Sequence, residues 1–128
     1  MLGFSIAIFP EENYIPSPKY WEREERWSMV LATWETSFRG TNWITALVKE
    51  GKATLLEGST GYSSRHRCRL SAIAGILNQG PPPHQSPPVV GDDYYLPGGW
   101  TGKIERHPER IARCHADDFV IIETMDLS

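Results

Sequence analysis

The chain has little of what a disulfide-rich, secreted or membrane-spanning protein needs. Two of its 128 residues are cysteine, which is too few for a cystine framework, so we expect Cys68 and Cys114 to be free thiols in a reducing compartment. No segment approaches the ~20 consecutive apolar residues that span a bilayer. Residues 1–9 lack the charged and then apolar order of a signal peptide. These absences predict a soluble, cytoplasmic protein without a membrane segment.

A surplus of positive charge is also missing. The 13 lysine and arginine residues are outnumbered by 16 aspartate and glutamate residues, which gives a formal net charge of −3. General binders of nucleic acid or of anionic membranes usually carry a basic surplus, so this balance argues against both classes. With 40% hydrophobic and 23% charged residues, residues 1–128 match one domain that buries its own core.

The first half of the chain predicts a strand, a long helix and a hairpin. The apolar run at residues 2–9 is typical of a buried strand. Residues 18–39 begin with proline and carry large apolar side chains at helical spacing, which predicts an amphipathic helix. Residues 42–57 fit either a hairpin or a short helix followed by a strand, and we favour the hairpin.

The second half predicts a second helix and a strand-rich end. Apolar side chains recur at helical spacing within residues 64–79, and the proline-rich residues 80–88 that follow predict an extended connector. Further strands are expected at residues 94–96, 101–107 and 119–125, with a short helix at residues 108–114. The order of elements predicts an α+β fold, a mostly antiparallel sheet with two main helices packed on one face, plus one short C-terminal helix.

Positive charge is concentrated in the segment SRHRCRL, residues 64–70. Its arginines follow a glycine- and hydroxyl-rich turn at the start of the expected second helix, where backbone N–H groups can bind an anion. Arginines in the first turn of a helix oppose its dipole, so they call for a negative partner, either carboxylates of this chain or an outside anion or acidic surface. We therefore predict a site for an anion or an acidic partner at Ser59, Thr60, Gly61, Ser64, Arg65, Arg67 and Arg69.

The segment GDDYYLPGGWTG, residues 91–102, has the composition of a binding loop. Aromatic side chains flanked by glycine, proline and acidic residues are common in protein interfaces. The alternative is that these aromatic rings fold back over the core. The candidate partner-binding residues are Asp92, Asp93, Tyr94, Tyr95 and Trp100.

Other chemistries find weaker support. The pairs His66 with Cys68 and Cys114 with His115 have spacings that do not chelate a metal, so no metal or cofactor is expected. A reactive thiol at Cys68 would have arginines on both sides, yet the sequence identifies no base to activate it.

These features predict a small module that binds another macromolecule. By analogy of size and composition, it would be a bacterial inhibitor or immunity-type protein that blocks a protein partner. One alternative is an enzyme with its site at residues 58–69, acting on a phosphate- or carboxylate-bearing substrate with Tyr62 or His66 as acid or base. Another is a local nucleic-acid contact through Arg65, Arg67 and Arg69. A small anion is the further ligand class left open.

Overall fold

The computed structural model describes residues 3–16, 18–60 and 62–127. The strands are β1 (Phe4–Pro10), β2 (Ala32–Thr36), β3 (Ala53–Leu55), β4 (Ser63–Arg69), β5 (Val89–Val90), β6 (Tyr95–Leu96), β7 (Thr101–Arg106) and β8 (Phe119–Asp126). The α-helices are α1 (Arg23–Trp27), α2 (Asn42–Lys49), α3 (Ala74–Gln79) and α4 (Pro108–Ala112). Three 3-10 turns, η1 (Tyr20–Glu22), η2 (Phe38–Thr41) and η3 (Leu70–Ile73), lead into α1, α2 and α3.

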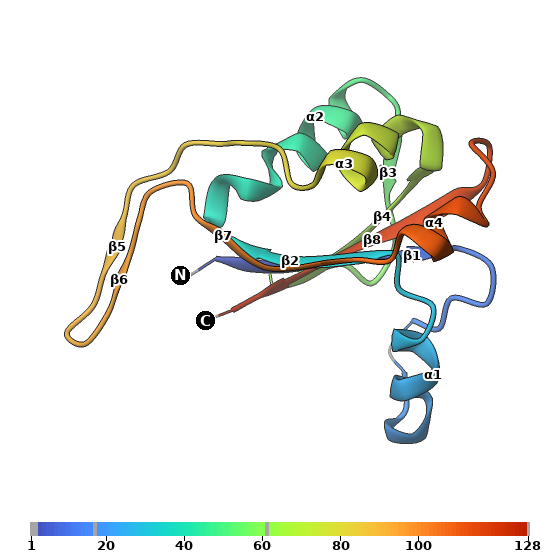
Figure 1. Cartoon of the computed structure of the whole chain (residues 1–128), viewed down its shortest axis with the longest axis horizontal. Coiled ribbons are helices and arrows are strands. Elements are labelled where there is room, and N and C mark those ends of the chain that lie inside the picture. The colour runs from blue at the N-terminus through green and yellow to red at the C-terminus, as the bar shows by residue number, and fades with distance from the viewer. Residues whose placement is uncertain (1–2, 17, 61, 128) are drawn as a thin grey trace.

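Six of these strands form one sheet in the order β3-β4-β8-β1-β2-β7, and β5 and β6 form a separate hairpin. Every neighbouring pair is antiparallel. Figure 1 shows α2 and α3 on one side of the sheet and α1 on the other. The α+β class and the antiparallel sheet predicted from the sequence are therefore confirmed. Among the described residues, no helix has the length and apolar character needed to cross a membrane.

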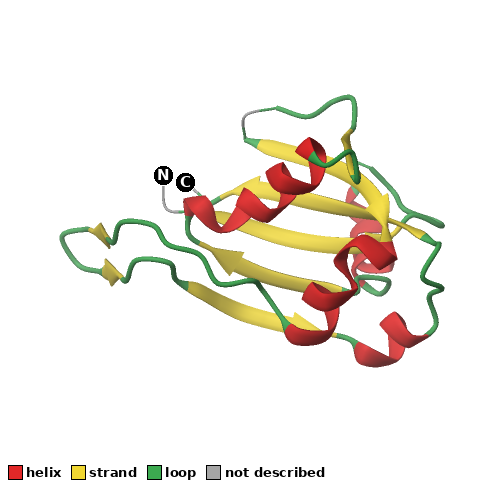
Figure 2. Ribbon diagram, turned by 90° about the horizontal axis from the view of Figure 1, so that it is seen from above, coloured by secondary structure: helices red, strands yellow, loops and turns green. Residues whose placement is uncertain are grey.

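The main core lies between the sheet and the helices α2 and α3 (Figure 2). Every second side chain of the central strands points towards these helices, because successive residues of a strand face opposite sides. The sheet contributes Ile6, Ile8, Ala32, Trp34, Val120 and Ile122, and the helical segments contribute Ile44, Ile73 and Leu77, all at most 3% exposed. Two helices do pack on one face, as predicted.

The prediction of a long helix at residues 18–39 is wrong. Helical structure stops at Trp27, and residues 32–36 form β2, which pairs with β1 and with β7. Burial along β2 alternates, with Trp34 at 2% exposure. Pairing with two strands buries this alternating face, and that gain outweighs the helical spacing of the larger side chains.

Residues 42–57 adopt the alternative that we did not favour. They form α2 and the short strand β3 rather than a hairpin. The helix places Ile44 in the core, and it ends before Gly51, whose φ of +74° is a conformation that favours glycine after a helix.

The predicted helix at residues 64–79 is correct only in its last part. Residues 63–69 form β4, and helical structure covers residues 70–79 as η3 and α3. Pairing with β3 and β8 on both sides explains the strand, because each neighbour satisfies backbone groups of β4. The strands β1, β7 and β8 and the helix α4 lie where the sequence predicts them.

The sheet face opposite α2 and α3 is called the open face here. Residues 11–16 and 18–30, which include α1, pack against one end of it (Figure 1). There Ala7, Phe9 and Val30 form a small buried cluster, with Tyr14 against it. The rest of this face carries the arginines of β4, which makes it the first surface to examine for function.

Candidate functional site

The arginines of the predicted anion site lie in a row on the open face. Arg65, Arg67 and Arg69 stand in register with Glu123, Ile121 and Phe119 of β8. The segment is a strand, so no helix dipole acts on these arginines, and the predicted helix start at this position is wrong. The row arises because side chains two apart on a strand share one face.

The three arginines have different partners. Arg67 makes a bidentate ion pair with Glu11, which holds the pKa of that carboxyl below its usual range, and its guanidinium lies 3.5 Å from the ring centroid of Phe119. Arg69 donates to the carbonyl of Asp117 at 3.1 Å. Arg65 donates to the carbonyl of Glu57 at 2.7 Å. The charge of Arg67 is thus balanced by a carboxylate of the same chain, whereas Arg65 donates a hydrogen bond to a neutral backbone carbonyl.

The hydroxyl groups predicted at this site build the turn between β3 and β4. Ser59 donates to the carbonyl of Leu56 at 2.8 Å and accepts from the backbone N–H of Arg65 at 3.1 Å. Thr60 accepts from the backbone N–H of Ser63 at 3.1 Å. The hydroxyl of Ser64 bonds that of Thr124. Gly61 lies outside the described residues. These side chains therefore position Arg65 by shaping its turn.

Arg65 lines a hollow of about 450 Å³ on the open face, together with Arg23 and Arg26 of α1. Glu123 of β8 also lines it. We call this site, defined by these four residues, the basic hollow. Its three arginines and one glutamate give a net formal charge of +2. Sequence reasoning found Arg65 alone, because α1, β4 and β8 are brought together only by the fold.

Two of the three arginines in the basic hollow have no ion pair in the part of the chain that the structure describes. The side chain of Arg26 is 9% exposed, and its Nη2 lies 2.6 Å from Oε1 of Glu123. Tyr14 donates its hydroxyl to the other oxygen of that carboxylate, and burial together with this bond raises the pKa of Tyr14. Within the described residues, Arg23 and Arg65 have no ion pair. They can therefore bind negative groups from outside.

His66 lies on the other face of β4, away from the arginines. It lines a hollow of about 190 Å³ with Tyr62 and several hydroxyl side chains, Thr41, Thr45, Thr60, Ser63, Ser64 and Thr124. Burial lowers the pKa of His66, and its Nδ1 has no hydrogen-bond partner among the described residues. An enzyme at residues 58–69 would need the arginines beside this imidazole, and the alternation of the strand separates them.

The predicted partner-binding loop is the tip and one strand of an arm. Residues 81–100, called the arm, run out from the sheet and back, with β5 and β6 paired near the tip (Figures 1 and 2). The side chains of Val90, Tyr95 and Tyr94 are 73%, 63% and 49% exposed. Asp92 and Asp93 form the turn between them and are also exposed. Trp100 is at the base and half-buried, and its carbonyl accepts from Ser37 at 3.0 Å.

The base of the arm is held by polar contacts and by glycine. Ser86 donates to the hydroxyl of Ser37 at 2.7 Å and accepts from the backbone N–H of Gly99 at 2.9 Å. His84 bonds the same Ser37. A Cβ at Gly98 would lie 2.3 Å from the carbonyl oxygen of Ser86. The outgoing and returning segments of the arm can therefore approach this closely only because residue 98 has no side chain. The arm therefore has a fixed root and an exposed end.

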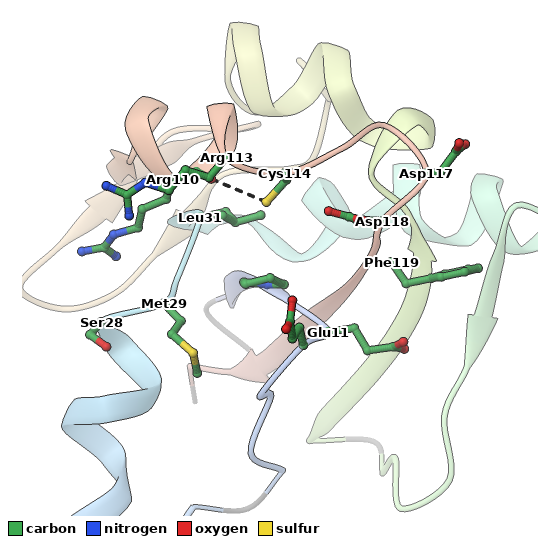
Figure 3. A pocket seen from close by; sticks show the side chains of 12 residues that line it. Glu11, Ser28, Met29, Leu31, Arg110, Arg113, Cys114, Asp117, Asp118 and Phe119 are labelled. Atoms are coloured by element: carbon green, nitrogen blue, oxygen red, sulfur yellow. Dashed lines mark hydrogen bonds between the residues drawn. The ribbon is translucent and has the colours of Figure 1, made fainter.

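A cavity of about 620 Å³ lies between α4, the loop before β8 and the segments that follow β1 and α1 (Figure 3). Its lining has both charges, and several of its groups already have partners. Arg110 donates to the carbonyl of Val30 at 2.9 Å, and Asp118 accepts from the N–H of His115 at 2.8 Å. Cys114 donates to the carbonyl of Arg110 at 3.5 Å, the dashed line in Figure 3. This cavity favours no single class of ligand.

The two thiols are poor nucleophiles. Burial raises the pKa of Cys68 to about 11 and also raises that of Cys114. Among the described residues, no three His, Cys, Asp or Glu side chains are grouped so that they could hold a metal ion. Comparison of the chain with protein-family models, curated proteins and solved structures finds no match.

Proposed function

We propose that this protein is a small binding module that captures a protein partner with its arm. The observation that carries the proposal is the exposure of Val90, Tyr94 and Tyr95 on a hairpin that extends away from the sheet (Figure 1). An isolated two-stranded hairpin is marginal in water, so an arm with fixed contacts at its base and apolar side chains at its end is suited to contact another surface.

The chemistry of the arm indicates the surface that it fits. Tyrosine offers a large contact area at a low cost in side-chain entropy and is enriched in interfaces. Asp92 and Asp93 add two negative charges between the apolar side chains. The partner surface is therefore basic with apolar pockets, and electrostatic complementarity would steer the encounter. Occupation of a basic site on the partner is how the module would inhibit it, as a bacterial immunity-type protein would.

The alternatives draw less support from the structure. The enzyme would use the arginines together with Tyr62 or His66, and both of these line the hollow on the other face of β4. A nucleic-acid contact through three arginines requires all three charges, and Arg67 already pairs with Glu11.

The test is capture of the partner from a lysate of the source cells by the immobilised protein. We expect Tyr94→Ala/Tyr95→Ala to lose about 30-fold or more in partner affinity, the effect of truncating an interface hot spot. Leu55→Ala is the matched control, because this side chain is 55% exposed on β3, at the sheet edge opposite β7. Wild-type capture by the folded double variant would refute the proposal.

Inhibition needs its own measurement once the partner is identified. The purified partner should lose activity when the wild-type protein is added and keep it when Tyr94→Ala/Tyr95→Ala is added at the same concentration. A partner that is bound through the arm and stays fully active would support a binding module and exclude an inhibitor.

A further inference from the structure

The basic hollow has the composition of a protein-binding site rather than of a site for a small ion. Arg23 and Arg65 bring uncompensated charge, and Trp27 and Met125, which are 48% and 53% exposed, line the same hollow. Tyr20 and Trp21, immediately before Arg23, are 83% and 73% exposed. Arginine, tryptophan, tyrosine and methionine are the residues enriched in interfaces, and a bare phosphate or chloride would leave the apolar ones unused.

The acidic residues of η1 and α1 do not line this hollow. Glu22, Glu24 and Glu25 belong to the same helical segment as Arg23, yet none of them lines it. Glu123 is engaged by Arg26 and Tyr14. The hollow therefore presents two positive charges beside apolar side chains.

The tip of the arm is complementary to this arrangement. Asp92 and Asp93 carry two negative charges, and Tyr94 and Tyr95 follow them directly as exposed rings. Carboxylates pair with arginine through bidentate hydrogen bonds, and tyrosine rings pack on tryptophan and methionine. Charge and apolar character thus match between the two surfaces.

The tip of the arm and the hollow lie apart in the molecule. The arm extends beyond one end of the sheet, and α1 lies under the other end (Figure 1). The tip of the arm therefore lies away from the hollow of its own chain, and a second copy is needed to bring the two together.

We propose that the basic hollow receives the Asp92-Asp93 tip of the arm from a second copy of this chain. The inference rests on the proposed function in so far as it treats the arm as a binding element. The contact joins two different surfaces, so repetition closes a ring or extends a chain of molecules. An arm that is occupied in this way is hidden from a foreign partner, so self-association and partner capture compete.

The test measures molecular mass by sedimentation over a wide range of protein concentration, at about 0.05 M and about 0.5 M salt. We expect the mass of the wild-type protein to rise above 14.5 kDa with concentration and to rise less at high salt, because salt screens exposed charges. Arg23→Gln/Arg65→Gln and Asp92→Asn/Asp93→Asn should each weaken association about tenfold or more.

Mixing the two double variants gives the sharpest result. One keeps an intact arm and the other an intact hollow, so a single productive contact remains, and the mixture should form a one-to-one dimer that does not grow. Arg39→Gln/Arg113→Gln is the matched control, because it removes the same charge at two exposed sites outside the hollow and should associate as the wild type does.

Three results would overturn the inference. These are a wild-type protein that stays monomeric at every concentration, an Arg23→Gln/Arg65→Gln variant that associates as the wild type does, and a mixture that stays monomeric. Partner capture separates this inference from the proposed function. The arginine variant should still capture the partner, whereas an arm variant that loses self-association but keeps capture would refute the proposed function alone.

Discussion

Replacing Glu123 with glutamine should strongly destabilise the fold, because this carboxylate balances a buried arginine. Arg26 is 7% exposed, its guanidinium lies 4.7 Å from the ring centroid of Phe9, and its Nε has no partner among the described residues. Glu123 accepts hydrogen bonds from Arg26 and from Tyr14. Within the described residues, Arg26 has no other ion pair.

The magnitude follows from what glutamine can replace. Its single carbonyl oxygen can keep one of the two charge-assisted hydrogen bonds, and losing the other costs about 1.5–3 kcal/mol. The charge of Arg26 then remains buried without a counter-charge, and breaking a buried pair in this way costs about 3–5 kcal/mol in all. We expect Glu123→Gln to lower the free energy of unfolding by about 3 kcal/mol.

Urea unfolding followed by tryptophan fluorescence measures this change. The double variant Arg26→Met/Glu123→Gln should lose less free energy of unfolding than the sum of the losses in Arg26→Met and Glu123→Gln, by about 1–3 kcal/mol, because it removes both members of the pair together. Glu11→Gln is the control. Glu11 also pairs with an arginine, Arg67, but the side chains of Arg67 and Glu11 are 39% and 40% exposed. An ion pair that is in contact with solvent contributes little to the free energy of unfolding. A loss below about 1 kcal/mol for Glu123→Gln would refute the reasoning.

Three further perturbations test other parts of the structure. Burial lowers the pKa of His66 from 6.5, so the unfolded chain binds a proton at a higher pH than the folded chain does. The free energy of unfolding should therefore fall as the pH drops from about 6.5 towards the lower pKa of the folded state. In urea midpoints measured against pH, His66→Gln should remove part of this dependence. With a pKa of about 11, the Cys68 thiol should react with iodoacetamide about 100-fold more slowly in the native than in the unfolded chain of a Cys114→Ala variant, and equal rates would contradict its burial. A Cβ at Gly40 would lie 1.8 Å from a threonine hydroxyl oxygen, so Gly40→Ala should lower the free energy of unfolding by about 1–3 kcal/mol. A Cβ at Gly75 in α3 would meet open space, so Gly75→Ala should raise the free energy of unfolding by about 0.5–1 kcal/mol. Changes of the same sign in both variants would refute the packing argument.

The elements with a strong local signal could be predicted from the sequence. β1 and β8 are short apolar runs, and α4 begins with Pro108, which suits the first turn of a helix. These signals need no knowledge of neighbours, which is why both strands, the helix and the α+β class were predictable.

β2 and β4 depend on their neighbours instead. Large apolar side chains recur through residues 18–39, which include β2, at a spacing that also fits a helix. The strand forms because β1 and β7 pair with its two edges. Residues 63–69 hold five polar or charged side chains in succession, a poor strand by composition, and they pair between β3 and β8. Such pairing cannot be read from a local pattern.

The basic hollow could not be predicted for the same reason. Arg23, Arg65 and Glu123 belong to three separate segments of the chain, and the register of β4 against β8 is what sets Arg65 opposite Glu123. A useful signal was present in Glu123 itself, since a single acid inside the apolar run FVIIETM usually has a buried positive partner.

The strand conformation of residues 63–69 also separates the groups that catalysis would use from those that binding would use. In a helix, His66, Cys68 and the arginines would point in several directions around one axis, and a mixed site of base, thiol and cation would be conceivable. In a strand they are sorted onto two faces, with His66 and Cys68 towards α2 and α3 and the arginines on the open face. Proton-transfer chemistry and anion recognition are thereby separated by the thickness of the sheet. What remains on the open face is charge with exposed aromatic side chains nearby, a combination that favours the proposed recognition of another surface.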